Sequence, residues 1–383
     1  MHIGVNARFL ASPFTGIGVY TRHLFSALAA QCPQDKIFMV APRESDFSFP
    51  PNVEKVVLPE KFPGTSGMRK TFWEQVQVPR LFSHLKTDLA HFPYPSNPWR
   101  GYDKPVVVTV HDTIPWVLPS YRKSVSTRLY QDRCRNAVKK ADHVVTVSES
   151  SKKEIIDLCG ISPSKISVIP NAPSPSFSKN LYPDERSGTL KKYGINPDRR
   201  FFLYCGGYDE RKNVSIITET YLSHIAPYHD IDLVLAGGKS HESALYSSYD
   251  LTNRKYSHSL GASKGKIIFT GFVSEEHFPA LYQSCFVFLN LSRREGFNLP
   301  LLEAAVSGAP VVASDIPVHR EVAGGYALFC PPDDKPAFAE VLKKLISDQS
   351  FYQKQKETSK KYVCPYSWEK SASGLTQIYK KCL

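Results

Sequence analysis

Short apolar runs alternate with helical patterns along nearly the whole chain, and this alternation constrains the fold more than any other feature. The runs have the length of buried strands, and helical stretches fall between many of them. Strands and helices that alternate in this way form parallel sheets covered on both faces. The sequence therefore predicts an α/β fold with strands at residues 3–5, 37–41, 53–58, 88–92, 106–110, 144–147, 201–205, 233–236, 267–270, 286–289, 311–313 and 327–329.

The chain is long enough for two domains, because 383 residues exceed what one hydrophobic core ordinarily holds. The most turn-rich interruption is at residues 170–177, where three prolines within six residues exclude a helix or a central strand. We therefore predict one Rossmann-like domain at residues 1–171 and a second at 172–363. The remaining residues, 364–383, carry an amphipathic helical pattern from Trp368 to Lys381.

Both domains are predicted to be doubly wound, with helices on the two faces of a parallel sheet. Ligands of such sheets bind beyond the carboxyl ends of the strands. For two such domains we expect the sheets to face one another across a cleft that holds the ligand.

The composition indicates an ordinary soluble protein. The hydrophobic content is 42% and the charged content 22%, and no apolar run approaches the roughly 20 residues of a spanning helix. The first residues predict a strand and not a secretory signal. The eight cysteines are scattered without a C-x-x-C pair, which favours free thiols in a reducing compartment. We therefore expect a cytoplasmic protein.

The net charge of +12 allows nucleic acid, an anionic membrane or phosphorylated substrates as partners. Part of the excess is local, since residues 121–153 contain nine Lys or Arg against three Asp or Glu. No Arg/Gly-rich tract and no RNP-like aromatic motif accompanies these cations, so nucleic acid is disfavoured. Two interpretations stay open: a solvated basic face, or peripheral contact with an anionic lipid surface at the inner face of the membrane.

Two glutamates eight positions apart, Glu295 and Glu303, flank a predicted helix start after a buried apolar run. Asn298 is expected to cap this helix, and Pro300 is tolerated in its first turn. Free backbone N–H groups at a helix start suit phosphate, and carboxylates suit sugar hydroxyls. A carboxylate among apolar residues is costly without a partner, so the pair indicates a binding site. The alternative is an ordinary helix start with favourable acidic residues.

A strand, a glycine turn and two adjacent cations, Arg211 and Lys212, open the second domain. Cations in this position can neutralise a pyrophosphate leaving group through charge-assisted hydrogen bonds. The alternative is a surface cluster of charged residues.

Three further motifs carry less weight. Gly16 and Gly18 follow the first strand, but the third glycine of a dinucleotide fingerprint is absent. His111 comes just after a buried strand and can donate to a sugar hydroxyl or to a backbone carbonyl. Asp230 and Asp232 spell D-x-D, yet nothing else supports a metal.

An aromatic, apolar and basic segment from Trp73 to His84, preceded by Arg69 and Lys70, has two interpretations. The first is a helix packed on its own sheet. The second is a surface for a lipid-linked acceptor.

Taken in order, these motifs resemble the retaining glycosyltransferases of the GT-B fold, the group-one family (family four). The resemblance covers almost the whole chain, and the E-x7-E spacing with its Gly-Phe and Leu-Pro neighbours is the specific part of it. The resemblance rests on Gly16, Gly18, the pair His111 and Asp112, residues 147–150, residues 168–171, Arg211, Lys212, residues 271–273, residues 295–303, residues 308–314 and residues 321–323.

The resemblance implies a role for each matching residue. Glu295 would hold the donor-sugar hydroxyls, Glu303 the ribose, and Arg211 with Lys212 the diphosphate. His111 would touch the transferred sugar, and Val273 would meet the base through its backbone. The other residues expected to bind the nucleotide sugar are Gly16, Gly18, Gly296, Phe297, Asn298 and Leu299.

Two departures from the family pattern matter. Many members have Gly-Arg where this chain has Gly206 and Gly207, so the role of Arg211 is less firm than that of Lys212. Many members have glycine where Asn298 stands, so that the asparagine side chain would reach the phosphate or sugar pocket.

The resemblance implies that a hexose moves from UDP-glucose-like or GDP-mannose donors to a glycan or lipid-linked glycan, in envelope or exopolysaccharide synthesis, without metal or cofactor. No side chain is an obvious base, so we expect front-face attack with the departing phosphate accepting the proton. Two rivals stay open: a sugar-nucleotide epimerase on the same fold, and a non-catalytic protein that binds nucleotide sugars.

Overall fold

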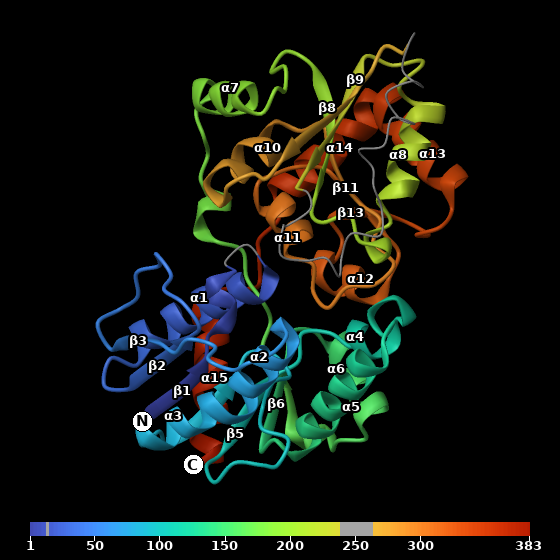
Figure 1. Ribbon diagram of the computed structural model, residues 1–383. Helices are drawn as coiled ribbons and strands as arrows, with labels where there is room; N and C mark the ends of the chain where they lie inside the picture. The colour runs from blue at the N-terminus through green and yellow to red at the C-terminus, as the bar shows by residue number, and fades with distance from the viewer. Residues whose placement is uncertain (13–14, 238–262) are drawn as a thin grey trace. The chain divides into compact units, whose positions relative to one another are not determined.

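A computed structural model describes residues 1–12, 15–237 and 263–383 of the chain (Figure 1). The chain divides into two compact units. Unit 1 comprises Met1–Ala172 together with Tyr366–Leu383, and unit 2 comprises Pro173–Pro365. Each unit has its own parallel sheet and its own hydrophobic core.

Unit 1 is built on a seven-stranded sheet in the order β3-β2-β1-β4-β5-β6-β7, in which every neighbouring pair is parallel. Its strands are β1 (His2–Asn6), β2 (Lys36–Ala41), β3 (Val53–Val57), β4 (Leu89–Phe92), β5 (Val106–Thr109), β6 (His143–Thr146) and β7 (Ile166–Val168). Its helices are η1 (Arg8–Ala11), α1 (Gly16–Gln31), α2 (Ser66–Phe72), η2 (Trp73–Gln77), α3 (Val78–His84), α4 (Ile114–Val117), η3 (Pro119–Tyr121), α5 (Val125–Lys140), α6 (Glu149–Cys159), η4 (Pro163–Lys165) and α15 (Trp368–Cys382).

Unit 2 is built on a six-stranded parallel sheet in the order β10-β9-β8-β11-β12-β13. Its strands are β8 (Arg200–Cys205), β9 (Ile231–Ala236), β10 (Ile267–Gly271), β11 (Val287–Asn290), β12 (Val311–Ser314) and β13 (Ala327–Cys330). Its described helices are η5 (Pro175–Ser178), α7 (Pro183–Lys192), η6 (Glu210–Lys212), α8 (Val214–His224), η7 (Glu275–His277), α10 (Phe278–Ser284), α11 (Leu299–Val306), α12 (Pro317–Ala323), α13 (Lys335–Ser347) and α14 (Gln349–Lys360).

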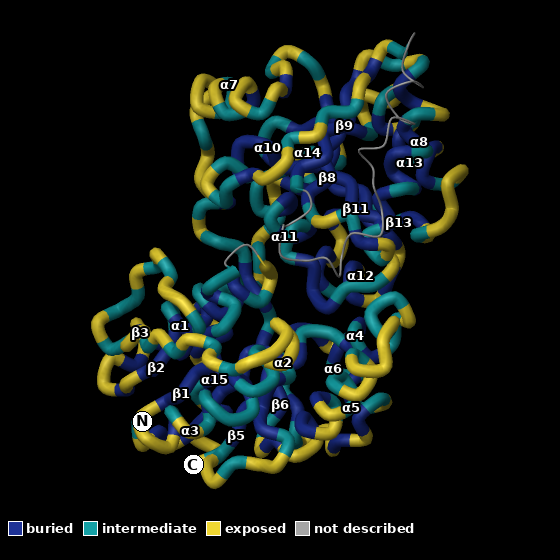
Figure 2. The backbone as a smooth tube through the Cα atoms, in the orientation of Figure 1, coloured by how far each residue is buried: buried dark blue, intermediate teal, exposed yellow. Residues whose placement is uncertain are grey.

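Every predicted strand is present, with ends that shift by one or two residues. The prediction missed β7, which has only three residues and carries a serine at its centre. So short a run lacks the apolar pattern by which strands are recognised. The central strands are buried on both faces, and Figure 2 shows them in the buried colour while α7 is largely exposed. This burial explains why the strands appear in the sequence as continuous apolar runs.

The C-terminal helix α15 packs against α1 within unit 1, and Figure 1 shows the two side by side. Its Tyr379 is fully buried, and the hydroxyl lies 2.5 Å from Nδ1 of His91 on β4. The other ring nitrogen of His91 lies 2.8 Å from the hydroxyl of Thr109 at the end of β5. These buried contacts fix the last helix of the chain to the centre of the unit 1 sheet.

The aromatic segment that begins at Trp73 packs on its own sheet, so its indole is not a lipid-facing surface. Trp73 is fully buried in the unit 1 core, and its Nε1 donates to the carbonyl of Leu58 at 2.6 Å. The indole therefore has its polar partner inside the protein, as a buried tryptophan requires.

Candidate functional site

The direction of the chain across the unit 2 sheet reverses between β8 and β11. From β8 the strand order runs through β9 to β10 on one side, and from β11 through β12 to β13 on the other. In open α/β sheets ligands bind beyond the carboxyl ends of the strands at such a switch point. Arg211 and Lys212 follow β8, and Glu295 follows β11, so the fold brings the predicted residues to this switch point.

The carboxylate of Glu295 bridges the two predicted cations. Its Oε1 accepts from Nζ of Lys212 at 2.6 Å, and its Oε2 accepts from Nη1 of Arg211 at 2.8 Å. The three side chains are largely buried, with exposed fractions of 7% for Glu295, 13% for Lys212 and 18% for Arg211. The two loops are also joined by the backbone, because Arg293 N donates to the Arg211 carbonyl at 2.7 Å.

The charges of this cluster are closely balanced, because Arg211 also lies 3.7 Å from the carboxylate of the buried Asp209. Burial alone raises the pKa of Glu295, but Arg211 and Lys212 outweigh burial and hold that pKa at about 2. Burial lowers the pKa of Lys212 and Arg211 adds to that shift, and the opposing charges of Glu295 and Asp209 do not restore the usual value. Two cations are thus held side by side in a place of low solvent access, where each could bind an oxygen of a diphosphate in place of its carboxylate partner.

Glu303 lies in a different environment on α11, away from any cation that shifts its pKa. Its Oε2 accepts a hydrogen bond from the Tyr282 hydroxyl at 3.2 Å. Burial raises the pKa of Glu303 to about 8; the hydrogen bond from Tyr282 opposes this rise without reversing it, and the negative charge of Glu275 adds to it. Glu303 is therefore protonated at pH 7, whereas Glu295 is a carboxylate.

Asn298 occupies the N-cap position of α11 but does not cap it, so that part of the prediction is wrong. Its backbone is left-handed, with φ 79° and ψ 68°, and its side chain makes no capping bond. The amide instead hydrogen-bonds to Asn290 at 3.3 Å and to His319 at 2.7 Å. A positive φ favours glycine, the residue that the family resemblance implies at this position.

The remaining predicted residues of unit 2 lie in or beside these loops. Gly296 and Phe297 are in the loop between β11 and α11, and Phe297 is buried. Leu299 is the first residue of α11. Val273 is buried in the segment after β10. Their contacts with a nucleotide sugar remain predictions.

His111 lies just beyond β5 in unit 1, and its hydrogen bond fixes the ring tautomer. Nε2 lies 2.9 Å from the carbonyl oxygen of Pro93, which can only accept, so Nε2 carries the hydrogen. Burial lowers the pKa of His111 to about 4. A neutral ring with Nε2 protonated offers Nδ1 as an acceptor, so at pH 7 His111 would accept from a sugar hydroxyl and not donate to it.

Gly16 and Gly18 open α1, as predicted. Thr15 caps the helix, and its hydroxyl accepts from the Gly18 N–H at 3.1 Å. A Cβ on Gly16 would meet no neighbour within 4 Å, so the position is open to close approach by a ligand. That the loop binds phosphate remains a prediction.

Both carboxylates of the D-x-D spelling are paired with Arg199. Asp232 is buried and forms a bidentate pair with Arg199, at 3.0 Å to Nε and 2.8 Å to Nη2. Asp230 forms a second ion pair with the same arginine. Within residues 1–12, 15–237 and 263–383, no three His, Cys, Asp or Glu side chains are grouped so as to hold a metal ion.

Sequence reasoning missed two buried side chains that contact the site, Tyr282 and His319. Tyr282 precedes a strand in a helix without any recognisable motif, so only the structure connects it to Glu303. His319 comes after the buried strand β12, as His111 comes after β5. This shared placement could have indicated His319 as a site residue.

A second polar network lies at the switch point of the unit 1 sheet, between β1 and β4. Nδ2 of Asn6 donates to the Tyr94 hydroxyl at 3.2 Å and to the Ser96 hydroxyl at 2.9 Å. Tyr94 in turn donates at 2.7 Å to the fully buried carboxylate of Glu74, which also accepts from Tyr130 at 2.8 Å. None of these residues formed a motif in the sequence.

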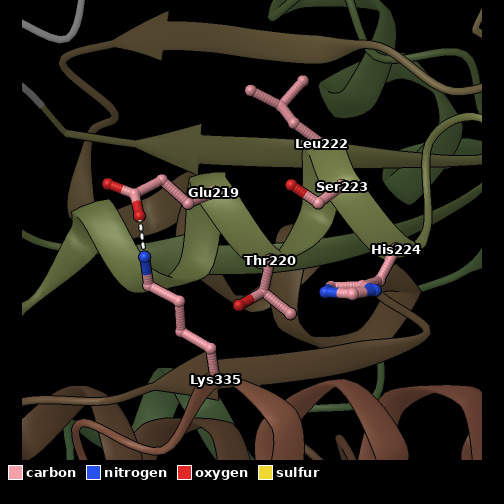
Figure 3. A pocket seen from close by; sticks show the side chains of 6 residues that line it. All are labelled: Glu219, Thr220, Leu222, Ser223, His224 and Lys335. Carbon is pink, nitrogen blue, oxygen red and sulfur yellow. Dashed lines mark hydrogen bonds and ion pairs between the residues drawn. The ribbon is translucent and has the colours of Figure 1, made fainter.

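A cavity of about 360 Å³ opens on unit 2 between α8 and the start of α13, away from the predicted residues (Figure 3). An ion pair between Lys335 and Glu219 crosses it. The lining residues are Glu219, Thr220, Leu222, Ser223, His224 and Lys335. This cavity has one cation, Lys335, where the predicted site has the adjacent pair Arg211 and Lys212.

None of the helices in the described part of the chain combines the length and the apolar character needed to cross a membrane.

Solved structures with similar folds cover the whole chain. Sucrose-phosphate synthase from Thermosynechococcus elongatus superposes with a TM-score of 0.76 at 19% identity, covering 100% of this chain and 98% of the other. The Anabaena protein HepE, in complex with UDP, superposes with a TM-score of 0.72 at 16% identity, covering 99% of both chains. These likenesses establish the GT-B fold with two Rossmann-like domains.

Curated relatives are less than one-third identical. The serotype-specific mannosyltransferase WbdA of Escherichia coli is 27% identical over 307 residues, 77% of this chain, but the match spans only 36% of that longer relative. The O-antigen chain mannosyltransferase B of Escherichia coli is 28% identical over 275 residues, 72% of this chain and 70% of the relative.

Two family profiles match successive parts of the chain. Residues 14–176 match Glycosyltransferase Family 4, and residues 186–362 match the glycosyl transferases group 1. The second match contains Arg211, Lys212 and both glutamates of the E-x7-E motif. The chain therefore belongs to the group 1 glycosyltransferases.

Proposed function

We propose that the protein transfers a hexose from a nucleotide diphosphate sugar to a glycan acceptor, with retention of the anomeric configuration and without a metal ion. The observation that carries the proposal is the buried cluster of Glu295 with Arg211 and Lys212 at the switch point of the unit 2 sheet. The cluster unites, in one place, cations for a diphosphate and a carboxylate for sugar hydroxyls.

In the free protein the Glu295 carboxylate is hydrogen-bonded to Arg211 and Lys212. When a donor binds, its two phosphates would take over Arg211 and Lys212, because a diphosphate carries more charge than a single carboxylate. Glu295 would then be released to accept from hydroxyls of the sugar. The same exchange places the cations against the leaving group, where charge accumulates as the glycosidic bond breaks.

Glu303 would hold the ribose hydroxyls, and His111 would accept from a hydroxyl of the transferred sugar. Arg211 and Lys212 supply stabilisation that a divalent cation supplies in other sugar transfers, which supports a metal-independent reaction. No described carboxylate or imidazole of the cluster is a suitable base for the acceptor, since Glu295 has a pKa of about 2. The departing phosphate would therefore accept the acceptor proton on the same face.

Donor and acceptor identity follow from the relatives only by analogy. HepE was solved with UDP, which favours a uridine nucleotide, whereas the curated relatives are named mannosyltransferases, which favours mannose. Glucose from UDP and mannose from GDP are therefore the two donors to test first. The O-antigen names favour a lipid-linked or polymeric glycan acceptor in envelope polysaccharide synthesis.

A panel of UDP-, GDP- and ADP-sugars tests this proposal. We expect one nucleotide to raise the melting temperature, and NMR of the transfer product to show the anomeric configuration of the donor. Conversion of the donor without an acceptor would instead indicate an epimerase. The absence of affinity for every nucleotide sugar would indicate that the protein is not a transferase of this class.

We also propose that α5 of unit 1, and not the Trp73 segment, meets an anionic lipid surface. Val125 and Leu129 lie one turn apart on the same face of α5 and are 68% and 54% exposed. The exposed cations on or beside this helix are Lys123, Arg128, Arg133, Lys139 and Lys140. Apolar side chains surrounded by cations suit a bilayer that contains phosphatidylglycerol.

Vesicle flotation tests this surface. The wild type should float with phosphatidylglycerol vesicles at low salt and remain unbound with phosphatidylcholine, and Leu129→Glu should abolish the flotation. Val363→Glu makes the same change of charge at a residue of unit 2 that is 85% exposed, and it serves as the control for net charge. Flotation of the Leu129→Glu variant equal to that of the wild type would exclude α5 as the contact.

A further inference from the structure

A buried chain of hydrogen bonds lies beneath the loop that carries Glu295. It begins at the backbone N–H of Ser292 and passes through Asn290, Asn298 and His319 to Ser314. Asn290 and His319 are fully buried, and Asn298 is 6% exposed. The chain joins the end of β11, the start of α11, the end of β12 and helix α12.

The direction of every bond follows from the backbone group at the first end. The Ser292 N–H can only donate, so the Asn290 atom 3.4 Å away is the amide oxygen. Nδ2 of Asn290 therefore faces Asn298 and donates to its Oδ1 at 3.3 Å. Nδ2 of Asn298 then faces the imidazole at 2.7 Å, so Nε2 of His319 must accept.

The backbone at the other end requires the same direction. The carbonyl oxygen of Ser314 can only accept, and it lies 3.0 Å from Nδ1 of His319, so Nδ1 carries the hydrogen. The Ser314 hydroxyl donates its only hydrogen to the carbonyl of Ser292 at 2.5 Å and can only accept from the same Nδ1. Both ends thus select one neutral tautomer of His319.

A protonated His319 would place an Nε2–H against the Asn298 amide hydrogens. The ring is therefore neutral in the intact chain, in accord with burial, which lowers the pKa of His319 to about 4. Glu295 opposes that shift and Lys212 adds to it, so the charged groups of the donor site act on this imidazole too.

Asn298 needs this anchor because of its backbone. A left-handed conformation is unfavourable for a residue with a Cβ, and asparagine tolerates it when its side chain is held by hydrogen bonds. The position matters for the donor because Asn298 lies between Glu295 and the first residue of α11, which carries Glu303.

We propose that His319 is a positioning residue for nucleotide-sugar binding, which holds Asn298 left-handed and thereby fixes the loop of Glu295 and the start of α11. The inference rests on the proposed function of that loop as the donor site. It assigns to His319 no contact with the donor and no part in the chemistry. Its effect passes entirely through the Asn298 side chain.

A double-mutant cycle with nucleotide binding as the readout tests this inference. UDP and GDP are titrated calorimetrically into the wild type, His319→Ala, Asn298→Gly and the double variant. His319→Ala should weaken binding about tenfold, because a buried amide loses its acceptor. Asn298→Gly supplies the reference affinity of a loop that needs no anchor, since glycine adopts a positive φ without one. In that background His319→Ala should have no further effect.

Rescue and stability controls separate positioning from folding. In His319→Gln the amide oxygen can accept from Asn298, so affinity should return to within about threefold of the wild type. Leu342→Ala, a core change in α13 away from the loop, should lower stability without changing affinity. If transfer is assayed, His319→Ala should raise the donor KM and leave the acceptor KM unchanged.

The imidazole tautomer is a second measurement that needs no variant. Long-range proton–nitrogen NMR of the wild type should show His319 protonated on Nδ1 and unprotonated on Nε2. The opposite tautomer, wild-type affinity in His319→Ala, or an equal loss in both backgrounds would each overturn the inference. A wild type that binds neither UDP nor GDP nor any other nucleotide sugar would instead count against the proposed function.

Discussion

The two glutamates of the E-x7-E motif should respond to the same substitution with opposite changes in stability. Glu295 and Glu303 both accept hydrogen bonds, but the pKa is lowered from 4.5 to about 2 in the first and raised from 4.5 to about 8 in the second. Replacing each with glutamine removes the charge and preserves the shape. The difference between the two variants therefore isolates electrostatics from packing.

Glu295→Gln should destabilise unit 2 by about 3 kcal/mol at pH 7, the worth of a shift of roughly two and a half pH units. Because the folded pKa is below the unfolded one, this contribution is fully present above pH 4.5. It is lost as the pH falls from 4.5 towards 2. The wild type and the variant should therefore converge in stability near pH 2 to 3.

Glu303→Gln should stabilise unit 2 at pH 7 by about 2 to 3 kcal/mol, because the wild type must hold a proton that the unfolded chain releases. The expected gain extends to the lower value because Glu303 is partly accessible to solvent, which weakens the effect of burial on its pKa. Since the folded pKa is raised, the folded state binds the extra proton between pH 4.5 and about 8. The advantage of the variant should grow through that window and level off above pH 8.

The tryptophans allow the two units to be followed separately. All four, Trp73, Trp99, Trp116 and Trp368, belong to unit 1, so their fluorescence reports that unit in urea titrations. Far-ultraviolet circular dichroism reports both units, and the transition absent from fluorescence belongs to unit 2. Both glutamine variants should move that transition alone.

Glu340→Gln is the matched control, because this glutamate is 73% exposed on α13 and forms a surface ion pair with Lys343. Its effect should be within about 0.5 kcal/mol at every pH. A Glu303→Gln variant less stable than the wild type at pH 8 would refute the assignment of a protonated Glu303. A loss in Glu295→Gln that does not depend on pH would refute the assignment of a buried carboxylate held by its cations.

Three other predictions concern the reaction. Lys212→Ala should lower transfer by roughly 100-fold or more with the fold intact, as expected for a group that stabilises leaving-group charge, and kinetics with a urea titration would check both. EDTA should leave transfer unchanged, and Asp232→Asn should reduce thermal stability without creating any metal requirement, since the Asp232 carboxylate is bound to Arg199. His111 has a pKa of about 4, so its protonation should reduce activity only below about pH 5. A kinetic pKa of 6 to 7 that disappears in His111→Gln would contradict that assignment.

The sequence predicted the architecture because parallel strands buried on both faces leave a visible trace. Each apolar run between helical stretches became a strand, and the one failure, β7, is the run too short to carry a pattern. The choice of site residues followed from motif order, and the fold placed Arg211, Lys212 and Glu295 in direct contact.

Other properties of the site depend on contacts that no local pattern encodes. The E-x7-E spacing does not distinguish Glu295 from Glu303. In the structure Glu295 is hydrogen-bonded to two cations, whereas Glu303 accepts a hydrogen bond from Tyr282. Asparagine is a common helix-cap residue, but Asn298 does not cap α11 because its backbone is left-handed. Its side chain is instead hydrogen-bonded to His319. A motif therefore located these residues but could not assign their protonation or conformation.

The internal pairing of the site also bears on the order in which parts of a donor are recognised. A neutral sugar has no charge with which to displace Lys212 or Arg211 from Glu295, so the sugar by itself meets a carboxylate already engaged at 2.6 Å and 2.8 Å. Under the proposed function, a diphosphate would compete directly for the cations, and its arrival would free the carboxylate. Recognition of the phosphates would then precede recognition of the sugar hydroxyls. Because the sugar would be bound through a residue that the phosphates release, we expect a hexose without its nucleotide to bind weakly.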